Sequence, residues 1–153
     1  MLTEADDLRE FKIFEELNER ELETVAAIAK TEELGKGARL TRAGSPASNL
    51  YLVKSGRVTI MSTDPGGKEV AVDEVGPGQV VGWSALTGPY IYTATTMTTE
   101  KSTIVVISGT KLRRIFEINN HIGYRVLKGI GYVVSRRLSG MEGKMAVGNH
   151  PSD

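Results

Sequence analysis

Ten glycines divide the middle of the chain into short segments, and this spacing limits the possible folds more than any other feature. The segments between them are rich in β-branched residues. Short strands separated by turn residues at such intervals are typical of β-sandwiches and β-barrels. The glycines are Gly35, Gly37, Gly44, Gly56, Gly66, Gly67, Gly76, Gly78, Gly82 and Gly88. The sequence therefore predicts a mainly β core.

Seven strands are expected in this core. Val58 and Ile60 alternate with polar residues, which indicates one buried and one wet face. The turn chemistry of residues 64–67, Asp-Pro-Gly-Gly, predicts a hairpin between the strands that flank it. Strands do not alternate with helices, so a doubly wound sheet is not expected. The expected strands are residues 39–42, 50–54, 57–62, 68–75, 79–81, 92–98 and 103–107.

Helical periodicity marks the part of the chain before the strands. Asn18 and Glu21 have the spacing of a capping box, so a helix is expected to begin there. Its apolar face comprises Leu22, Val25, Ala26 and Ala29, and Phe11, Phe14 and Leu17 predict a shorter helical turn upstream.

After the strands the period becomes helical again. Thr110 is expected to cap a short helix, and Asn119 or Asn120 a longer one. The longer helix carries an apolar stripe of Ile122, Val126, Ile130, Val133, Val134, Leu138 and Met141.

Gly123, Gly129 and Gly131 interrupt the long helix, and each costs about 1 kcal/mol relative to alanine in an exposed helix interior. Close packing against the barrel or against a second copy of the helix would offset that cost. The stripe is longer than a small barrel would cover, which favours a homodimer formed through this helix.

The length of 153 residues indicates one domain. We divide it into an N-terminal helical segment (1–34), a β-barrel core that senses a ligand (35–108), C-terminal helices with the dimer helix (109–145) and a frayed tail (146–153). The absence of cysteine excludes disulfides and thiolate metal sites. The acidic start lacks the features of a secretory signal, and no membrane span is indicated, so a cytoplasmic location is predicted.

Three motifs in order carry a family resemblance. Residues 40–58 contain a glycine turn, the strand Leu50-Tyr51-Leu52-Val53 and the Ser55-Gly56 hairpin, and residues 76–82 read Gly-Pro-Gly-Gln-Val-Val-Gly. The third motif is Gly82-Trp83-Ser84-Ala85-Leu86, followed after a loop by Tyr92-Thr93-Ala94. In this order they resemble the cyclic nucleotide-binding domain family, with the third as its phosphate-binding cassette. The resemblance implies an antiparallel jelly-roll β-barrel between helical ends.

The cassette departs from the family pattern at two positions. The resemblance implies that a glutamate binds the ribose where Trp83 stands, and that an arginine binds the phosphate where Tyr92 stands. Losing a charge-assisted hydrogen bond costs about 1.5–3 kcal/mol, so tight binding of cyclic AMP is not expected. No lysine or arginine lies between Lys68 and Lys101 to replace the arginine.

The ligand-binding residues implied by the cassette are Gly82, Trp83, Ser84, Ala85, Tyr92, Thr93 and Ala94. Two interpretations remain open: Trp83, Tyr90 and Tyr92 line a pocket for a flat, less anionic ligand, or they fill it and close the barrel. In relatives, residues late in the long helix reach the base, and Met141 and Glu142 occupy that region.

The sequence thus predicts a non-catalytic regulatory sensor that binds a cyclic nucleotide (cyclic AMP or cyclic GMP) or an unidentified small molecule, with no other cofactor implied. Alternatives are a ligand-free interaction or dimerisation module, and the sensor half of a transcription regulator without its DNA-binding domain. Only nine residues follow Lys144, too few for a recognition helix, so no direct DNA binding is expected. A metal enzyme of the cupin type is not favoured, because His121 and His150 are the only histidines.

Overall fold

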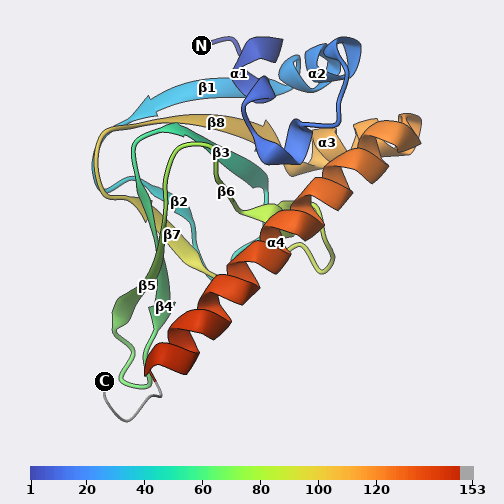
Figure 1. Ribbon diagram of the computed structural model, residues 1–153. Helices are drawn as coiled ribbons and strands as arrows, with labels where there is room; N and C mark the ends of the chain where they lie inside the picture. The colour runs from blue at the N-terminus through green and yellow to red at the C-terminus, as the bar shows by residue number, and fades with distance from the viewer. Residues whose placement is uncertain (149–153) are drawn as a thin grey trace.

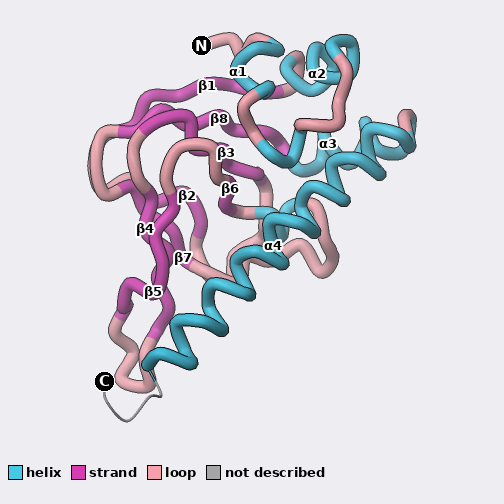
Figure 2. Tube along the Cα trace, viewed as in Figure 1, coloured by secondary structure: helices cyan, strands magenta, loops and turns pink. Residues whose placement is uncertain are grey.

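Two four-stranded antiparallel sheets form the centre of the computed structural model, which describes the backbone of residues 1–148 and the side chains of residues 1–139. One sheet has the order β1 (Ala29–Leu34), β8 (Ser102–Ser108), β3 (Asn49–Ser55) and β6 (Val80–Val81). The other has the order β2 (Arg39–Thr41), β7 (Thr95–Thr98), β4 (Val58–Thr63) and β5 (Glu69–Val75). Helical segments lie at both ends of the chain (Figure 1, Figure 2). The predicted mainly β fold with helical ends is confirmed.

The N-terminal segment contains a strand where only helix was expected. Helix α2 (Glu19–Ala26) begins at the predicted capping box: the Asn18 side chain accepts from the Glu21 N–H and the Glu21 carboxylate accepts from the Asn18 N–H, both at 2.9 Å. The chain then enters β1, in which Ala29 pairs with Ile107 of β8. Ala29 was therefore wrongly assigned to the helix. The strand is largely polar and takes its conformation from pairing with β8, which is a long-range contact.

Two other local expectations need correction. Helix α3 (Gly109–Ile118) is capped by Ser108, whose Oγ accepts from the Lys111 N–H at 3.3 Å, and not by Thr110. The strand expected from residue 92 begins at Thr95, and residues 92–94 belong to the loop before it. For helix α4 (Asn120–Gly148) the predicted cap is confirmed, since Asn119 Oδ1 accepts from two backbone N–H groups of its first turn.

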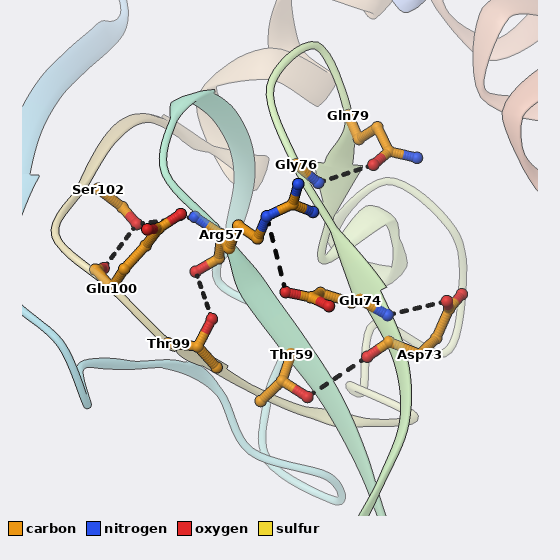
Figure 3. Close-up of polar contacts among 9 residues, drawn as sticks. All are labelled: Arg57, Thr59, Asp73, Glu74, Gly76, Gln79, Thr99, Glu100 and Ser102. Carbon is orange, nitrogen blue, oxygen red and sulfur yellow. Dashed lines mark hydrogen bonds and ion pairs between the residues drawn. The ribbon is translucent and has the colours of Figure 1, made fainter.

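The hairpin between β4 and β5 follows the predicted turn chemistry. Asp64 Oδ1 accepts from the N–H groups of Gly66 and Lys68, at 2.9 and 2.8 Å. At the other end of this pair, side chains fix the neighbouring turns (Figure 3). Thr59 Oγ1 donates to the Asp73 carbonyl at 3.3 Å, and Gln79 Oε1 accepts from the Gly76 N–H at 2.7 Å. The first contact joins β4 to β5, and the second closes the turn before β6.

The N-terminal segments α1 (Ala5–Arg9), η1 (Lys12–Phe14) and α2 pack with α4 over the first sheet. Gly129 explains the close approach of α4, since a Cβ there would lie 2.7 Å from the Cα of Ile13 in η1. Gly131 has no atom within 4 Å of the place its Cβ would take. A Cβ on Gly123 would likewise lie 3.0 Å from the Cβ of Phe116, so Gly123 and Gly129 serve packing within the chain, whereas Gly131 faces open space.

The apolar stripe of α4 changes environment along the helix. Ile122, Val126 and Ile130 are buried in the core, Val133 and Val134 are partly buried, and Leu138 is exposed. The side chain of Met141 lies outside the described residues. Of the predicted tail, residues 146–148 continue α4 and residues 149–153, including His150, lie outside the described part. No helix of the described residues is long and apolar enough to cross a membrane.

Candidate functional site

A pocket of about 300 Å³ opens between the second sheet, the segment 82–94 and helix α4. This volume is at the lower end of the range for small-molecule sites, about 300–1,000 Å³. Of the two interpretations left open by the sequence, the structure has the pocket and not the filled barrel. Its lining residues are Thr41, Ile60, Met61, Ser62, Val72, Asp73, Val81, Gly82, Trp83, Ser84, Tyr92, Thr93, Ala94, Thr96, Val134, Arg137 and Leu138.

Gly82 sets the path of the chain into the pocket wall. Its φ of +82° lies in the left-handed region, and a Cβ at this position would approach the Asn49 carbonyl oxygen to 2.9 Å. The short helix η2 (Trp83–Ala85) follows directly and places Trp83 and Ser84 in the lining. A glycine is therefore required here for two reasons, backbone conformation and space.

Six of the seven residues predicted for the site line this pocket: Gly82, Trp83, Ser84, Tyr92, Thr93 and Ala94. Ala85 does not. It is fully buried in a small cluster with Ala47 and Tyr92, and its carbonyl accepts a hydrogen bond from Arg113. Ala85 thus lies behind the pocket wall, in contact with Tyr92. A role of the other six in binding a ligand stays a prediction.

Tyr92, at the position that the resemblance gives to arginine, has its hydroxyl engaged elsewhere. The hydroxyl donates to the Asn49 carbonyl at 2.6 Å and accepts from the Asn49 N–H at 2.9 Å. Only 7% of the residue is exposed, and burial raises the pKa of this phenol to about 12. Its ring forms part of the pocket wall, while its polar end holds the start of β3 to the loop before β7.

Tyr90 is not a lining residue, contrary to the expectation from the sequence. The loop turns its ring outward, where it is 42% exposed and lies 4.1 Å from the Arg113 guanidinium carbon. The backbone of Tyr90 has a φ of +62°, in the left-handed region. Among the residues whose side chains the structure describes, only Trp83 and Tyr92 supply aromatic surface to the pocket.

Arg137 of α4 is a pocket residue that the sequence analysis did not find. Its guanidinium carbon lies 4.5 Å from the centre of the Trp83 ring, and its Nη2 donates to the Val80 carbonyl. Burial lowers the pKa of Arg137 to about 10, an effect that the negative charge of Asp73 partly opposes. The group therefore stays positively charged at neutral pH, in a desolvated position.

The sequence did contain a signal for Arg137. It follows Ile130 by seven positions, so it lies on the same side of α4 as the buried stripe, where a charged residue is unusual. Met141 and Glu142, expected near a ligand base, have side chains outside the described residues.

The lining combines apolar walls with hydroxyl groups and two charges of opposite sign, Asp73 and Arg137. Thr41 and Thr96 already share a hydrogen bond at 2.8 Å between their hydroxyl oxygens. Within the described residues there is no group of three or more His, Cys, Asp or Glu side chains placed to hold a metal ion. The arrangement suits the binding of an amphipathic small molecule.

Comparison with known proteins identifies one domain family. The model of the cyclic nucleotide-binding domain family matches residues 31–119, more than half of the chain. A candidate cyclic nucleotide-binding protein from Geobacter metallireducens GS-15 superimposes with a TM-score of 0.79 at 28% identity, over 88% of this chain and 97% of that one. No curated protein matches the chain.

Two further solved structures are similar. The regulatory domain of Toxoplasma gondii protein kinase A, crystallised with cyclic AMP, has a TM-score of 0.66 at 26% identity, over 72% of this chain and 42% of that one. The catabolite activator protein of Thermus thermophilus has a TM-score of 0.72 at 20% identity, over 89% of this chain and 62% of that one, a likeness of fold.

Proposed function

Because the chain belongs to the cyclic nucleotide-binding domain family, we propose that it is a non-catalytic regulatory sensor that binds a small molecule in the pocket and transmits binding through α4. One observation carries this proposal: the pocket wall is shared between the cassette segment 82–94 and helix α4, which contributes Val134, Arg137 and Leu138. A ligand that fills the pocket contacts both. Its binding free energy therefore depends on where α4 lies, and this dependence is what a sensor needs.

The ligand of this proposal is a cyclic nucleotide or a less anionic small molecule. The positions of the family glutamate and arginine are occupied by Trp83, which stacks on Arg137, and by Tyr92, whose hydroxyl is bonded to Asn49. Neither can take over the ionic contacts of the residue it replaces. We therefore expect this cassette to bind cyclic AMP more weakly than a cassette that has the family's glutamate and arginine.

A thermal shift with cyclic AMP and cyclic GMP tests the proposal. Ligand at about a hundred times its dissociation constant adds about 2.7 kcal/mol to the free energy of unfolding. We expect the shift to disappear in Thr93→Phe, because Thr93 lines the pocket and a larger side chain there obstructs it. Thr63→Phe, on the exposed end of β4, is the matched control. An unchanged melting temperature at millimolar nucleotide refutes sensing of these two ligands.

A homodimer through α4 is part of the proposal. Helix α4 exposes apolar residues at coiled-coil spacing: Tyr124 at 67%, Leu127 at 42% and, at the rim of the pocket, Leu138 at 53%, with Gly131 between them. Residues at this spacing bring two copies of one helix together along a continuous apolar seam. The same face supports the alternative of a ligand-free dimerisation module, which an absence of any ligand effect would favour.

Sedimentation velocity tests the dimer. Leu127→Glu places a charge in the proposed seam and is expected to give a monomer at micromolar concentration. Thr24→Glu adds the same charge to the exposed surface of α2 and should leave the dimer intact. A wild-type monomer at these concentrations contradicts the proposal.

A cytoplasmic location and a role as the sensor half of a transcription regulator stay predictions.

A further inference from the structure

The cation missing from the cassette has a counterpart on helix α4. The sequence between Lys68 and Lys101 contains no lysine or arginine, yet Arg137 enters the pocket from α4. A partly buried guanidinium needs polar partners, since desolvating a charge is costly. This group donates a hydrogen bond to the Val80 carbonyl through Nη2. A guanidinium has five N–H donors, so donors remain for a ligand.

Trp83 and Arg137 together form a composite surface. The guanidinium carbon lies 4.5 Å from the centre of the indole ring, which is the distance of a cation–π contact. Stacking of this kind pre-organises the fork of N–H groups that binds carboxylate or phosphate oxygens in a bidentate manner. The indole also offers flat apolar surface within the same pocket. A ligand with an anionic group and an aromatic ring therefore finds a partner for each, Arg137 for the charge and the neighbouring Trp83 for the ring.

Asp73 is the competing charge in the lining. It acts on Arg137 and keeps its pKa from falling further. The Asp73 carboxylate also accepts from the Glu74 N–H at 2.8 Å, which orients one of its oxygens along β5 (Figure 3). A ligand anion at Arg137 is attracted by the guanidinium and repelled by this carboxylate. Removing the charge of Arg137 should therefore weaken anion binding, and removing the charge of Asp73 should strengthen it.

Resting on the proposed function, we infer that the pocket selects a small aromatic anion, whose charged group is held by Arg137 of α4 and whose ring lies against the wall formed with Trp83. The charge is thus bound by a residue of α4, beside Trp83 of the cassette. Because the contact is made by α4 itself, ligand charge and helix position are directly coupled. The shared chemistry is an aromatic ring with a phosphate or carboxylate group.

Two probe pairs on the full chain test the inference. Cyclic AMP and adenosine share base and ribose and differ in the anionic phosphate, while benzoate and benzamide differ in the charge of the carboxyl group. Trp83 is the only tryptophan, so its fluorescence reports binding in this pocket. We expect the anionic member of at least one pair to bind about ten- to a hundred-fold more tightly than its neutral partner. A preference within the first pair identifies phosphate as the anionic group that the pocket binds, and a preference within the second identifies carboxylate.

Variants then test which residues cause the preference for the anionic probe. Arg137→Gln should abolish the preference for the anion, whereas Arg136→Gln, an exposed neighbour, should keep it. Asp73→Asn should tighten anion binding and leave the neutral partners unchanged. It provides the decisive measurement if Arg137→Gln does not fold.

Three results overturn the inference: equal affinity for charged and neutral probes, a preference that survives in Arg137→Gln, or anion binding unaffected by Asp73→Asn. If neutral probes bind and Thr93→Phe blocks them, the sensor proposal stands while this inference fails. If no probe changes the fluorescence and cyclic nucleotides cause no thermal shift, both fail.

Discussion

Replacing Tyr92 by phenylalanine removes a hydroxyl that makes two hydrogen bonds to the backbone of Asn49, at 2.6 and 2.9 Å. Each such bond contributes about 0.5–1.5 kcal/mol net, and a buried partner left unsatisfied costs about 1–3 kcal/mol. The ring of the phenylalanine keeps the apolar contacts of the tyrosine with Ala47 and Ala85. We therefore expect Tyr92→Phe to lower the free energy of unfolding by about 2 kcal/mol.

Urea unfolding at neutral pH measures this loss, with a matching fall in melting temperature of about 4–8 °C. Tyr132→Phe is the control, because Tyr132 is half exposed on α4 and its hydroxyl is not part of this contact. The control should change the free energy of unfolding by less than about 0.5 kcal/mol. If Tyr92→Phe is equally mild, the hydroxyl does not hold the loop, and the reasoning that it is withdrawn from ligand binding fails.

Three further predictions concern stability. The folded pKa of Tyr92 is raised to about 12, and an unfolded tyrosine titrates near about 10. The folded chain keeps a proton that the unfolded chain releases, so the free energy of unfolding should fall as pH rises between these values, and Tyr92→Phe should flatten that fall in urea titrations. Gly129→Ala should destabilise by about 1–3 kcal/mol, because its methyl group meets the backbone of η1, whereas Gly131→Ala should stabilise by about 0.5–1 kcal/mol in thermal melts. Glu21→Gln should cost about 1–3 kcal/mol in urea, because it weakens the 2.7 Å contact with Arg125 that ties α2 to α4; an unchanged midpoint would contradict this.

Local chemistry made much of the fold predictable. Asn18 and Asn119 cap their helices as expected, and Asp64 organises the β4–β5 turn, because these contacts join residues only a few positions apart. Strand β1 was missed because most of its residues are polar, and its pairing with β8 joins distant parts of the chain. Ser108 was missed as a cap because two hydroxyl residues, Ser108 and Thr110, stand close together and sequence alone does not choose between them.

The pocket wall formed by the cassette segment was predictable from the sequence, and the wall formed by α4 was not. Motif order placed Gly82, Trp83 and Thr93 together, and all three line the pocket. Arg137 was missed because the course of α4 across the pocket depends on packing such as the contact of Gly129 with η1. Whether the aromatic residues fill the pocket was also undecidable, since it depends on side-chain directions: Tyr90 turns outward and Tyr92 turns toward Asn49.

Amide hydrogen exchange, followed by mass spectrometry with and without saturating cyclic AMP or cyclic GMP, tests the central claim of a pocket shared between cassette and helix most directly. If either nucleotide binds there, residues 82–94 and residues 133–139 of α4 should become protected together, and Thr93→Phe should abolish both effects. Protection of the cassette segment with no change in α4, or no protection of either, would contradict the claim that this chain senses a ligand through its helix.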